Sequence, residues 1–226
     1  MVTLHQPGDS RSTLRDAKGF TLVEFMIACL ITTAVLGGTV MLASQLQQGY
    51  ATQLDDVLVE QEVRFALDWI TRLLRSAGSN PYSVNTSPCP VVGTPFQAIR
   101  LDPDGDGMDD DIRIQADISP PNGILGGNVA GTCTEEGEDV TIAHDADALT
   151  ITRQDNNIDL DPEAMTEPII TELEFTYLDS ARNVTADADV IAFVQVQVTG
   201  RSKTYNTILG ENPETTLNTE VRLRIR

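Results

Sequence analysis

An apolar run at residues 20–43, FTLVEFMIACLITTAVLGGTVMLA, decides the architecture of this chain. Its 24 positions hold a single charged residue, Glu24. At 1.5 Å per residue, a helix of this length spans roughly 36 Å, which is enough to cross the hydrocarbon core of a bilayer. The apolar part of a secretory signal peptide is shorter, at about 7–15 residues. The sequence therefore predicts a transmembrane helix at residues 20–43.

Glu24 is the informative residue within this run. Insertion scales assign a carboxylate at the centre of a membrane helix a cost of about 2.5–3.5 kcal/mol, so such a residue usually faces a partner. A chain cut just before Phe20 would supply one, because its new amine lies four residues away. A plain signal anchor is the alternative interpretation, and it leaves Glu24 without a role.

The residues around this point carry a resemblance to a known family. Lys18-Gly19-Phe20-Thr21-Leu22-Val23-Glu24, followed by the apolar helix, resembles the cleavage and methylation signature of type IV prepilins and pseudopilins. In that family a membrane peptidase cuts after the Gly, the new Phe amine is methylated, and the Glu pairs with the amine of a neighbouring subunit. The resemblance implies a leader peptide at 1–19, cleavage between Gly19 and Phe20, and N-methylation of Phe20. It also implies that Glu24 acts in assembly, with prepilin peptidase, other pilins and the inner membrane as partners.

Beyond residue 43 the helical pattern continues in a different form. Apolar residues recur at three- and four-residue steps, so residues 44–78 are predicted to extend the helix as an amphipathic segment that ends at Gly78. One helix from Phe20 to Ala77 is expected, with its second half packed on a sheet. The stretch 63–78 looks like the helix end of PilW-type minor pilins, and Glu220–Arg224 resembles their last strand.

Residues 79–226 are predicted to form an antiparallel β head domain, because short strand signals follow one another without helical crossovers. The fold class is therefore α+β, with a long N-terminal helical spine on an antiparallel sheet, as in pilins. The predicted strands are 98–101, 112–116, 140–143, 149–153, 170–178, 191–199 and 221–225.

An acidic loop follows the first of these strands. Residues 102–110 match D-x-D-x-D-G-x-x-D, a spacing that lets carboxylates converge on Ca²⁺ when the chain turns sharply at Gly107. A solvated Asp/Gly hairpin is the alternative, although six aspartates in ten residues repel one another without a cation. A second acidic stretch, 155–161, is predicted to be a solvated loop. The predicted ligands are Asp102, Asp104, Asp106, the Met108 carbonyl and Asp110, with Asp109 or Asp111 as alternatives to Asp110.

Cysteine usage and charge bound the function further. Cys89 and Cys133 lie in polar surroundings and are expected to form a disulfide in an exported domain, whereas Cys29 belongs to the apolar run. The chain has 34 Asp+Glu against 15 Lys+Arg, a net charge of −19 that argues against a nucleic-acid partner. Only two histidines are present, and no G-x-S-x-G or Walker motif. We therefore expect no catalytic residues and no small-molecule substrate.

The resemblance and the residues together favour a minor pilin of a type IV pilus. Its helix would anchor in the bacterial inner membrane with a periplasmic head before assembly into an extracellular pilus, where it takes part in assembly or initiation. A type II secretion pseudopilin of the GspJ kind has the same leader, helix and head, and is the first alternative. A calcium-dependent adhesin or binding module on a pilin stalk is the second, and it needs an exposed binding surface.

Overall fold

The computed structural model describes residues 19–87, 89, 94–127, 132–158, 161–204 and 210–223. The chain forms two compact units, which meet in the sequence between Gly49 and Tyr50. The first unit contains the apolar part of the long helix, and the second contains the rest of that helix together with all of the strands.

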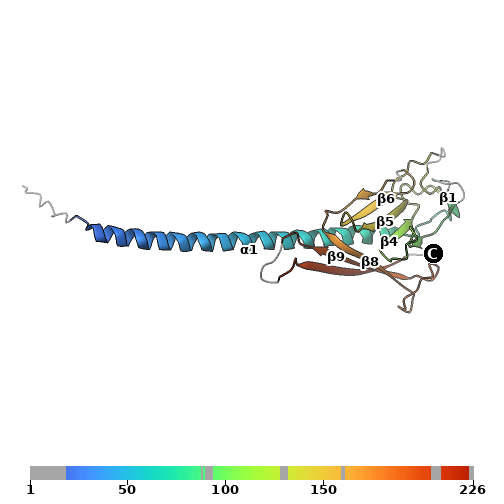
Figure 1. The fold of residues 1–226 in the computed structure, drawn as a ribbon. Helices are drawn as coiled ribbons and strands as arrows, with labels where there is room; N and C mark the ends of the chain where they lie inside the picture. Colours follow the sequence, from blue (N-terminus) through green and yellow to red (C-terminus); the bar gives the residue numbers. More distant parts are fainter. Residues whose placement is uncertain are drawn as a thin grey trace, which may run out of the picture. The chain divides into compact units, whose positions relative to one another are not determined.

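Helix α1 runs without interruption from Leu22 to Ser76, a length of 55 residues (Figure 1). The predicted helix from Phe20 to Ala77 is thus confirmed to within two residues at each end. An 18-residue window of α1 has a mean hydropathy of 2.1, so the helix is long and apolar enough to cross a membrane.

Polar side chains within the apolar run are satisfied by the helix itself. Thr32 Oγ1 donates to the Ala28 carbonyl at 2.7 Å, and Thr39 Oγ1 donates to the Leu36 carbonyl at 2.9 Å. Such internal bonds remove the need for water as a partner, which suits a hydrocarbon environment. All residues described from Gly19 to Gly49 are exposed within this chain.

The second half of α1 forms the centre of the core of the second unit. Its buried positions recur every three or four residues, as an amphipathic helix requires. At the end of the helix, Gly78 adopts a φ of 73°, a left-handed conformation that suits glycine after a helix C-terminus. The buried residues of α1 are Val59, Val63, Ala66, Leu67, Ile70, Thr71 and Leu74.

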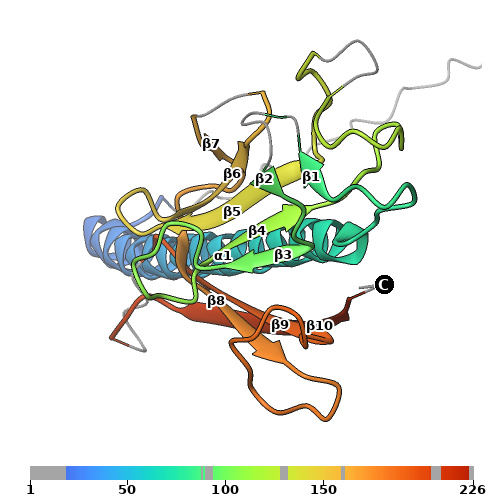
Figure 2. The same ribbon diagram turned by 90° about the vertical axis from the view of Figure 1, so that its right-hand side faces the viewer.

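Two antiparallel sheets pack against this half of α1 (Figure 2). The antiparallel pairing is as the sequence predicts, whereas the division of the strands into two sheets was not predicted. The five-stranded sheet has the order β3-β4-β5-β6-β7, and the three-stranded sheet has the order β10-β9-β8. A separate pair, β1-β2, completes the described strands. The bounds are β1 Thr86–Ser87, β2 Thr94–Pro95, β3 Ile99–Leu101, β4 Asp111–Gln115, β5 Asp139–Asp145, β6 Thr150–Asp155, β7 Glu163–Ala164, β8 Ile170–Leu178, β9 Phe193–Arg201 and β10 Glu214–Arg222.

Gly200 in β9 lies close against helix α1. A Cβ atom placed on Gly200 in β9 would lie 2.8 Å from Val63 Cγ2 and 3.0 Å from Val59 Cγ1 of α1. Carbon atoms do not approach this closely without displacement, so the backbone of β9 reaches the helix only because residue 200 has no side chain.

Two predictions from the sequence differ from the structure. Strand β10 begins at Glu214 rather than near residue 221, because its half-buried positions include Thr215 and Thr219, which give no apolar alternation. The stretch 155–161 is not simply a solvated loop. Asp155, the last residue of β6, is buried, and its carboxylate accepts the Gly137 N–H at 2.6 Å as an internal hydrogen-bond acceptor. The predicted strand residues 224 and 225 lie outside the described chain.

Candidate functional site

The start of α1 carries a reciprocal capping arrangement. The Glu24 N–H donates to Thr21 Oγ1 at 3.2 Å, and Glu24 Oε2 accepts the Thr21 N–H at 3.4 Å. This is a capping box, in which the N-cap and the third helical residue satisfy each other's backbone donors. The T-x-x-E spacing at 21–24 is itself a signal for this cap, which the charge of Glu24 alone does not indicate.

Gly19 and Phe20 precede the helix in an exposed segment without regular secondary structure. Phe20 is 87% exposed, and a Cβ placed on Gly19 would have no neighbour within 4 Å. Glu24 is also exposed, one turn into the helix. The peptide bond between Gly19 and Phe20 is therefore open to a protease, and the Glu24 carboxylate is open to a partner outside this chain.

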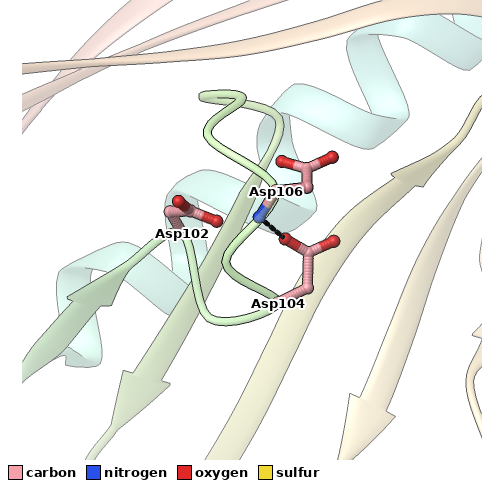
Figure 3. Close-up of side chains that lie close together, drawn as sticks. All are labelled: Asp102, Asp104 and Asp106. Carbon is pink, nitrogen blue, oxygen red and sulfur yellow. Dashed lines mark hydrogen bonds between the residues drawn. The ribbon is translucent and has the colours of Figure 1, made fainter.

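The acidic loop between β3 and β4 gathers three of the predicted ligands. One carboxylate oxygen from each of Asp102, Asp104 and Asp106 lies within 4.8 Å of the others (Figure 3). The loop backbone is held by these same side chains, since Gly105 N–H donates to Asp102 Oδ1 at 2.7 Å and Gly107 N–H to Asp102 Oδ2 at 3.1 Å. Both glycines have positive φ angles, of 81° and 84°, which permit the tight winding.

The remaining predicted ligands lie differently. The Met108 N–H donates to Asp106 Oδ1 at 2.8 Å, and the Asp110 carbonyl accepts the His144 N–H from β5 at 3.2 Å. Asp110 does not belong to the three-carboxylate group. Asp111 lies beside this group instead, because its Oδ2 accepts the Asp104 N–H at 3.2 Å.

Asp111 has an unusual environment for a carboxylate. It is 2% exposed, and within the described chain its Oδ1 has no hydrogen-bond partner. Burial raises the pKa of Asp111 to about 7, and the negative charges of Asp104, Asp102 and Asp110 add to the rise, while the Asp104 N–H opposes it. Burial also raises the pKa of Asp110, with the Asp106 charge contributing. The loop therefore concentrates negative charge, and none of the salt bridges in the described part of the chain involves its aspartates.

The loop also connects the two sheets. The Phe175 N–H of β8 donates to the Asp109 carbonyl at 2.7 Å, and the Tyr177 hydroxyl donates to the Asp111 carbonyl at 3.4 Å. Burial raises the pKa of Tyr177, and the nearby aspartates raise it further, so this hydroxyl stays protonated and able to donate. A change in the loop is thus transmitted to β8 as well as to β3 and β4.

A disulfide joins Cys89 to Cys133, with Cα atoms 5.7 Å apart, and Cys29 is a free, exposed cysteine of α1. Sequence reasoning did not identify the buried carboxylates near this cross-link. Glu138 is fully buried, and it accepts backbone N–H groups of Ile118 at 2.9 Å and Gly126 at 2.7 Å. These bonds satisfy the charge of Glu138 and order the irregular segment before β5.

Comparison with known proteins identifies one segment of the chain. Residues 14–40 match the family described as the prokaryotic N-terminal methylation motif. No curated protein and no solved structure matches the chain. The match includes Gly19, Phe20 and Glu24, so the chain carries the processing signal of type IV pilin-like proteins and pseudopilins. This signal implies cleavage by a prepilin peptidase and assembly with other pilins.

The signal and the fold are consistent with each other. A single long apolar helix, packed at its far end on antiparallel sheets, is the α+β architecture expected of a pilin-like protein. The apolar helix is also consistent with membrane anchoring. The class of protein suggested by these observations is structural rather than enzymatic.

Proposed function

We propose that this protein is a minor pilin of a type IV pilus, made as a precursor with a leader at residues 1–19. The observation that carries the proposal is the methylation motif at residues 14–40, which overlaps the start of helix α1. The second half of the same helix belongs to the head, where it contributes to the core. A plain membrane anchor needs neither a Gly-Phe junction nor a carboxylate at the fifth residue after it. The helix would lie in the inner membrane, with the head in the periplasm, until assembly.

Glu24 would act at the assembly step. After cleavage the Phe20 amine is protonated, and N-methylation keeps its positive charge, so a neighbouring subunit's amine would be attracted to the exposed Glu24 carboxylate. Burying a paired carboxylate and ammonium is far less costly than burying either charge alone. The pair would also define the axial position of one helix against the next.

The head would bind one Ca²⁺ in the acidic loop. The donor set is entirely oxygen, which suits a hard cation that takes six to eight oxygen ligands. The unpartnered, buried Oδ1 of Asp111 supports this assignment, because a buried carboxylate oxygen without a partner is costly unless a cation or donor satisfies it. Asp102, Asp104, Asp106 and the Met108 carbonyl would hold the ion. Asp111 is favoured over Asp110 as the closing ligand.

Ca²⁺ would strengthen the junction between the two sheets. The ion would neutralise the repulsion among the loop carboxylates and hold the loop in the conformation that bonds Phe175 and Tyr177 of β8. The role proposed here is structural, comparable to that of the Cys89–Cys133 disulfide in the same head.

Mass spectrometry of the N-terminal peptide from the native protein tests the processing proposal. The expected chain begins at N-methylated Phe20. A chain that begins at Met1 in cells with an active prepilin peptidase would contradict it. If the chain is processed but co-purifies with a type II secretion apparatus rather than with pili, the protein is a pseudopilin.

Thermal unfolding of the full chain in detergent tests the metal site. Trp69, the only tryptophan, packs against the head core and reports its unfolding by fluorescence. At about 100 times the Kd, Ca²⁺ is expected to add about 2.7 kcal/mol and raise Tm by roughly 5–10 °C. Asp104→Asn with Asp106→Asn should abolish this rise. The control pair Asp187→Asn with Asp189→Asn changes the charge equally in an exposed turn and should retain it.

The same measurement distinguishes the two candidates for the closing ligand. Asp111→Asn should reduce the Ca²⁺-induced rise in Tm, whereas Asp110→Asn should leave most of it. Comparing the rise, rather than Tm itself, removes any effect of the substitutions on the metal-free protein. A full rise in Asp111→Asn would show that Asp111 is not a ligand.

A further inference from the structure

Strand β10 is paired on one side only. It pairs with β9 over its nine residues, and in the described part of the chain no strand pairs with its other side. The edges of the five-stranded sheet are much shorter, since β3 has three residues and β7 has two. Long open edges are uncommon in native proteins, because they invite pairing with other chains. The open side of β10 therefore calls for a physical explanation.

The opposite edge of the same sheet, formed by β8, is covered. The Ile170 N–H donates to the Leu149 carbonyl at 2.8 Å. The Phe175 N–H donates to the Asp109 carbonyl at 2.7 Å. Loops of the head thus bond to the side of β8 that is turned away from β9. The fold protects one edge of the three-stranded sheet and leaves the other open.

The backbone groups on the open side belong to alternate residues of β10. The Ser202 N–H donates to the Pro213 carbonyl at 2.9 Å, and the Leu223 N–H donates to the Ala192 carbonyl at 2.9 Å. These two bonds flank β10 at odd-numbered positions, and bonding to an antiparallel partner alternates along a strand, so the odd-numbered residues face β9. The even-numbered residues point their N–H and C=O groups to the open side, where no backbone hydrogen bond of the described residues uses them. They are Glu214, Thr216, Asn218, Glu220 and Arg222.

A row of such groups matches another polypeptide strand. Successive outward-pointing residues lie about 6.8 Å apart, because each residue of an antiparallel strand advances the chain by about 3.4 Å. Each residue offers one donor and one acceptor, and an extended backbone presents the complementary groups with the same spacing. Main-chain hydrogen bonds supply the affinity when a peptide adds to a sheet edge in this way. The edge therefore selects an extended polypeptide segment.

Strand β10 also lacks the features that protect open edges. Such features include proline, lysine and β-bulges. β10 contains neither proline nor lysine, and its pairing with β9 has no register shift. Its central residues, 215–219, are uncharged and include three β-branched threonines. This composition suits pairing on both sides of the strand.

The charges on β10 do not oppose a partner strand. Glu214 is paired with Arg201 at 2.6 Å, and Glu220 is paired with Arg182 at 2.9 Å. Arg222 is exposed, and no salt bridge among the described residues involves it. The edge therefore carries two neutralised carboxylates and one free positive charge, in a chain whose net charge is −19.

We propose that the open edge of β10 binds an extended segment of another protein, which adds to the sheet as a fourth strand. The segment is uncharged where it lies against residues 215–219, and it carries a carboxylate beside Arg222. A second copy of this chain is disfavoured, because two chains of net charge −19 repel each other. The contact gives the head a binding partner in addition to the assembly contacts proposed for α1.

A synthetic peptide tests the proposal. The peptide alternates threonine and valine, ends in one aspartate, and is blocked at both termini. We expect it to bind the full chain in detergent and to slow hydrogen exchange of residues 214–222, measured by mass spectrometry. The same peptide with every backbone amide methylated should not bind, because it cannot donate to the edge. A version with lysine in place of aspartate should bind up to about fivefold more weakly, since it loses the exposed ion pair with Arg222.

Two substitutions at one position provide the matched pair of variants. Asn218→Pro removes an outward N–H that β9 does not use, and proline is tolerated at such a position of an edge strand. It should weaken binding by about tenfold, the effect of one lost hydrogen bond. Asn218→Ala keeps the backbone N–H and should bind normally. Thermal unfolding followed by Trp69 fluorescence verifies that both variants are folded.

Each other result overturns a specific part of the reasoning. Absence of peptide binding to the folded wild type overturns the docking site. Equal binding of the methylated peptide overturns strand addition, and equal binding by Asn218→Pro places the peptide elsewhere. Equal binding of the lysine peptide overturns the role of Arg222. Dimers of the wild type in sedimentation, absent from Asn218→Pro, would identify a second copy as the partner and overturn the proposed partner class.

Discussion

Replacing Glu24 with Gln separates the helix-capping role seen in the structure from the proposed role of this side chain in assembly. Gln retains the capping box with Thr21, because an amide oxygen accepts the same backbone N–H, but it removes the negative charge. Thr21→Ala does the reverse, since it removes the cap hydroxyl that the Glu24 N–H uses and leaves the charge in place. The two variants therefore form a matched pair.

The expected magnitudes differ enough to decide between the roles. Loss of an N-cap costs about 1 kcal/mol, and in a helix of 55 residues it affects only the first turn. Loss of one partner of a buried ion pair costs about 3–5 kcal/mol, because the other charge stays buried without compensation. At about 1.4 kcal/mol per tenfold change, Glu24→Gln should weaken helix-to-helix assembly by roughly two to three orders of magnitude. Thr21→Ala should weaken it by less than tenfold.

The assay compares pilus fractions sheared from cells that express each variant. The amount of the protein in the pilus is measured against the amount in the membrane, and N-terminal mass spectrometry confirms that cleavage before Phe20 is equal. We expect Glu24→Gln to be cleaved normally and to remain in the membrane. Wild-type incorporation of Glu24→Gln, or an equal defect in Thr21→Ala, would refute the charge-pair reasoning and reduce Glu24 to a helix cap.

Three further substitutions test the head, each by thermal or denaturant unfolding followed through tryptophan fluorescence. Gly200→Val should destabilise the head by about 1–3 kcal/mol, because the added side chain overpacks the contact with α1. Val63→Ala should relieve part of this loss in the double variant. Additive losses in the double variant would contradict the close contact. Cys89→Ser with Cys133→Ser should lower the free energy of unfolding by about 4 kcal/mol, the value of the chain-entropy model for a separation of 44 residues. An unfolding midpoint equal to that of the wild type under oxidising conditions would contradict a stabilising role of the disulfide. Leu74→Ala, at a fully buried position, should cost about 2–5 kcal/mol, and a loss below 1 kcal/mol would show that the helix end is not part of the core.

The loop illustrates how far local sequence reasoning reaches. The D-x-D-x-D-G spacing predicts the convergence of Asp102, Asp104 and Asp106, because residues a few positions apart in a tight loop meet through local backbone geometry alone. Whether Asp110 or Asp111 lies beside these three carboxylates depends on where β4 begins. It also depends on which face of the sheet the side chain of its first residue, Asp111, lies on. That face is set by pairing with β5, where Asp111 lies opposite Ala143.

A hydrogen-bonded network between β4 and β5 shows the opposite case. Arg113 donates to the buried Asp139 carboxylate in two bonds of 2.6 Å, and Gln115 donates to it at 2.7 Å. Arg113, Gln115 and Asp139 meet because the register of β4 on β5 places Gln115 opposite Asp139 and Arg113 opposite Thr141. No spacing within the sequence identifies this arrangement, since more than twenty residues separate the two strands along the chain. A shift of the register by one residue would move every one of these side chains to the other face.

By itself, the sequence determined the long helix, its apolar first half, the processing signal and the antiparallel character of the head. These features depend on local periodicity, residue type and short spacing, which act between neighbours along the chain. Only the tertiary structure decided that Gly200 lets β9 reach the helix, and that Asp111 is buried with an oxygen that has no partner in the described chain. These features depend on strand register and on the packing of distant segments, and those are decided by the burial of the core as a whole.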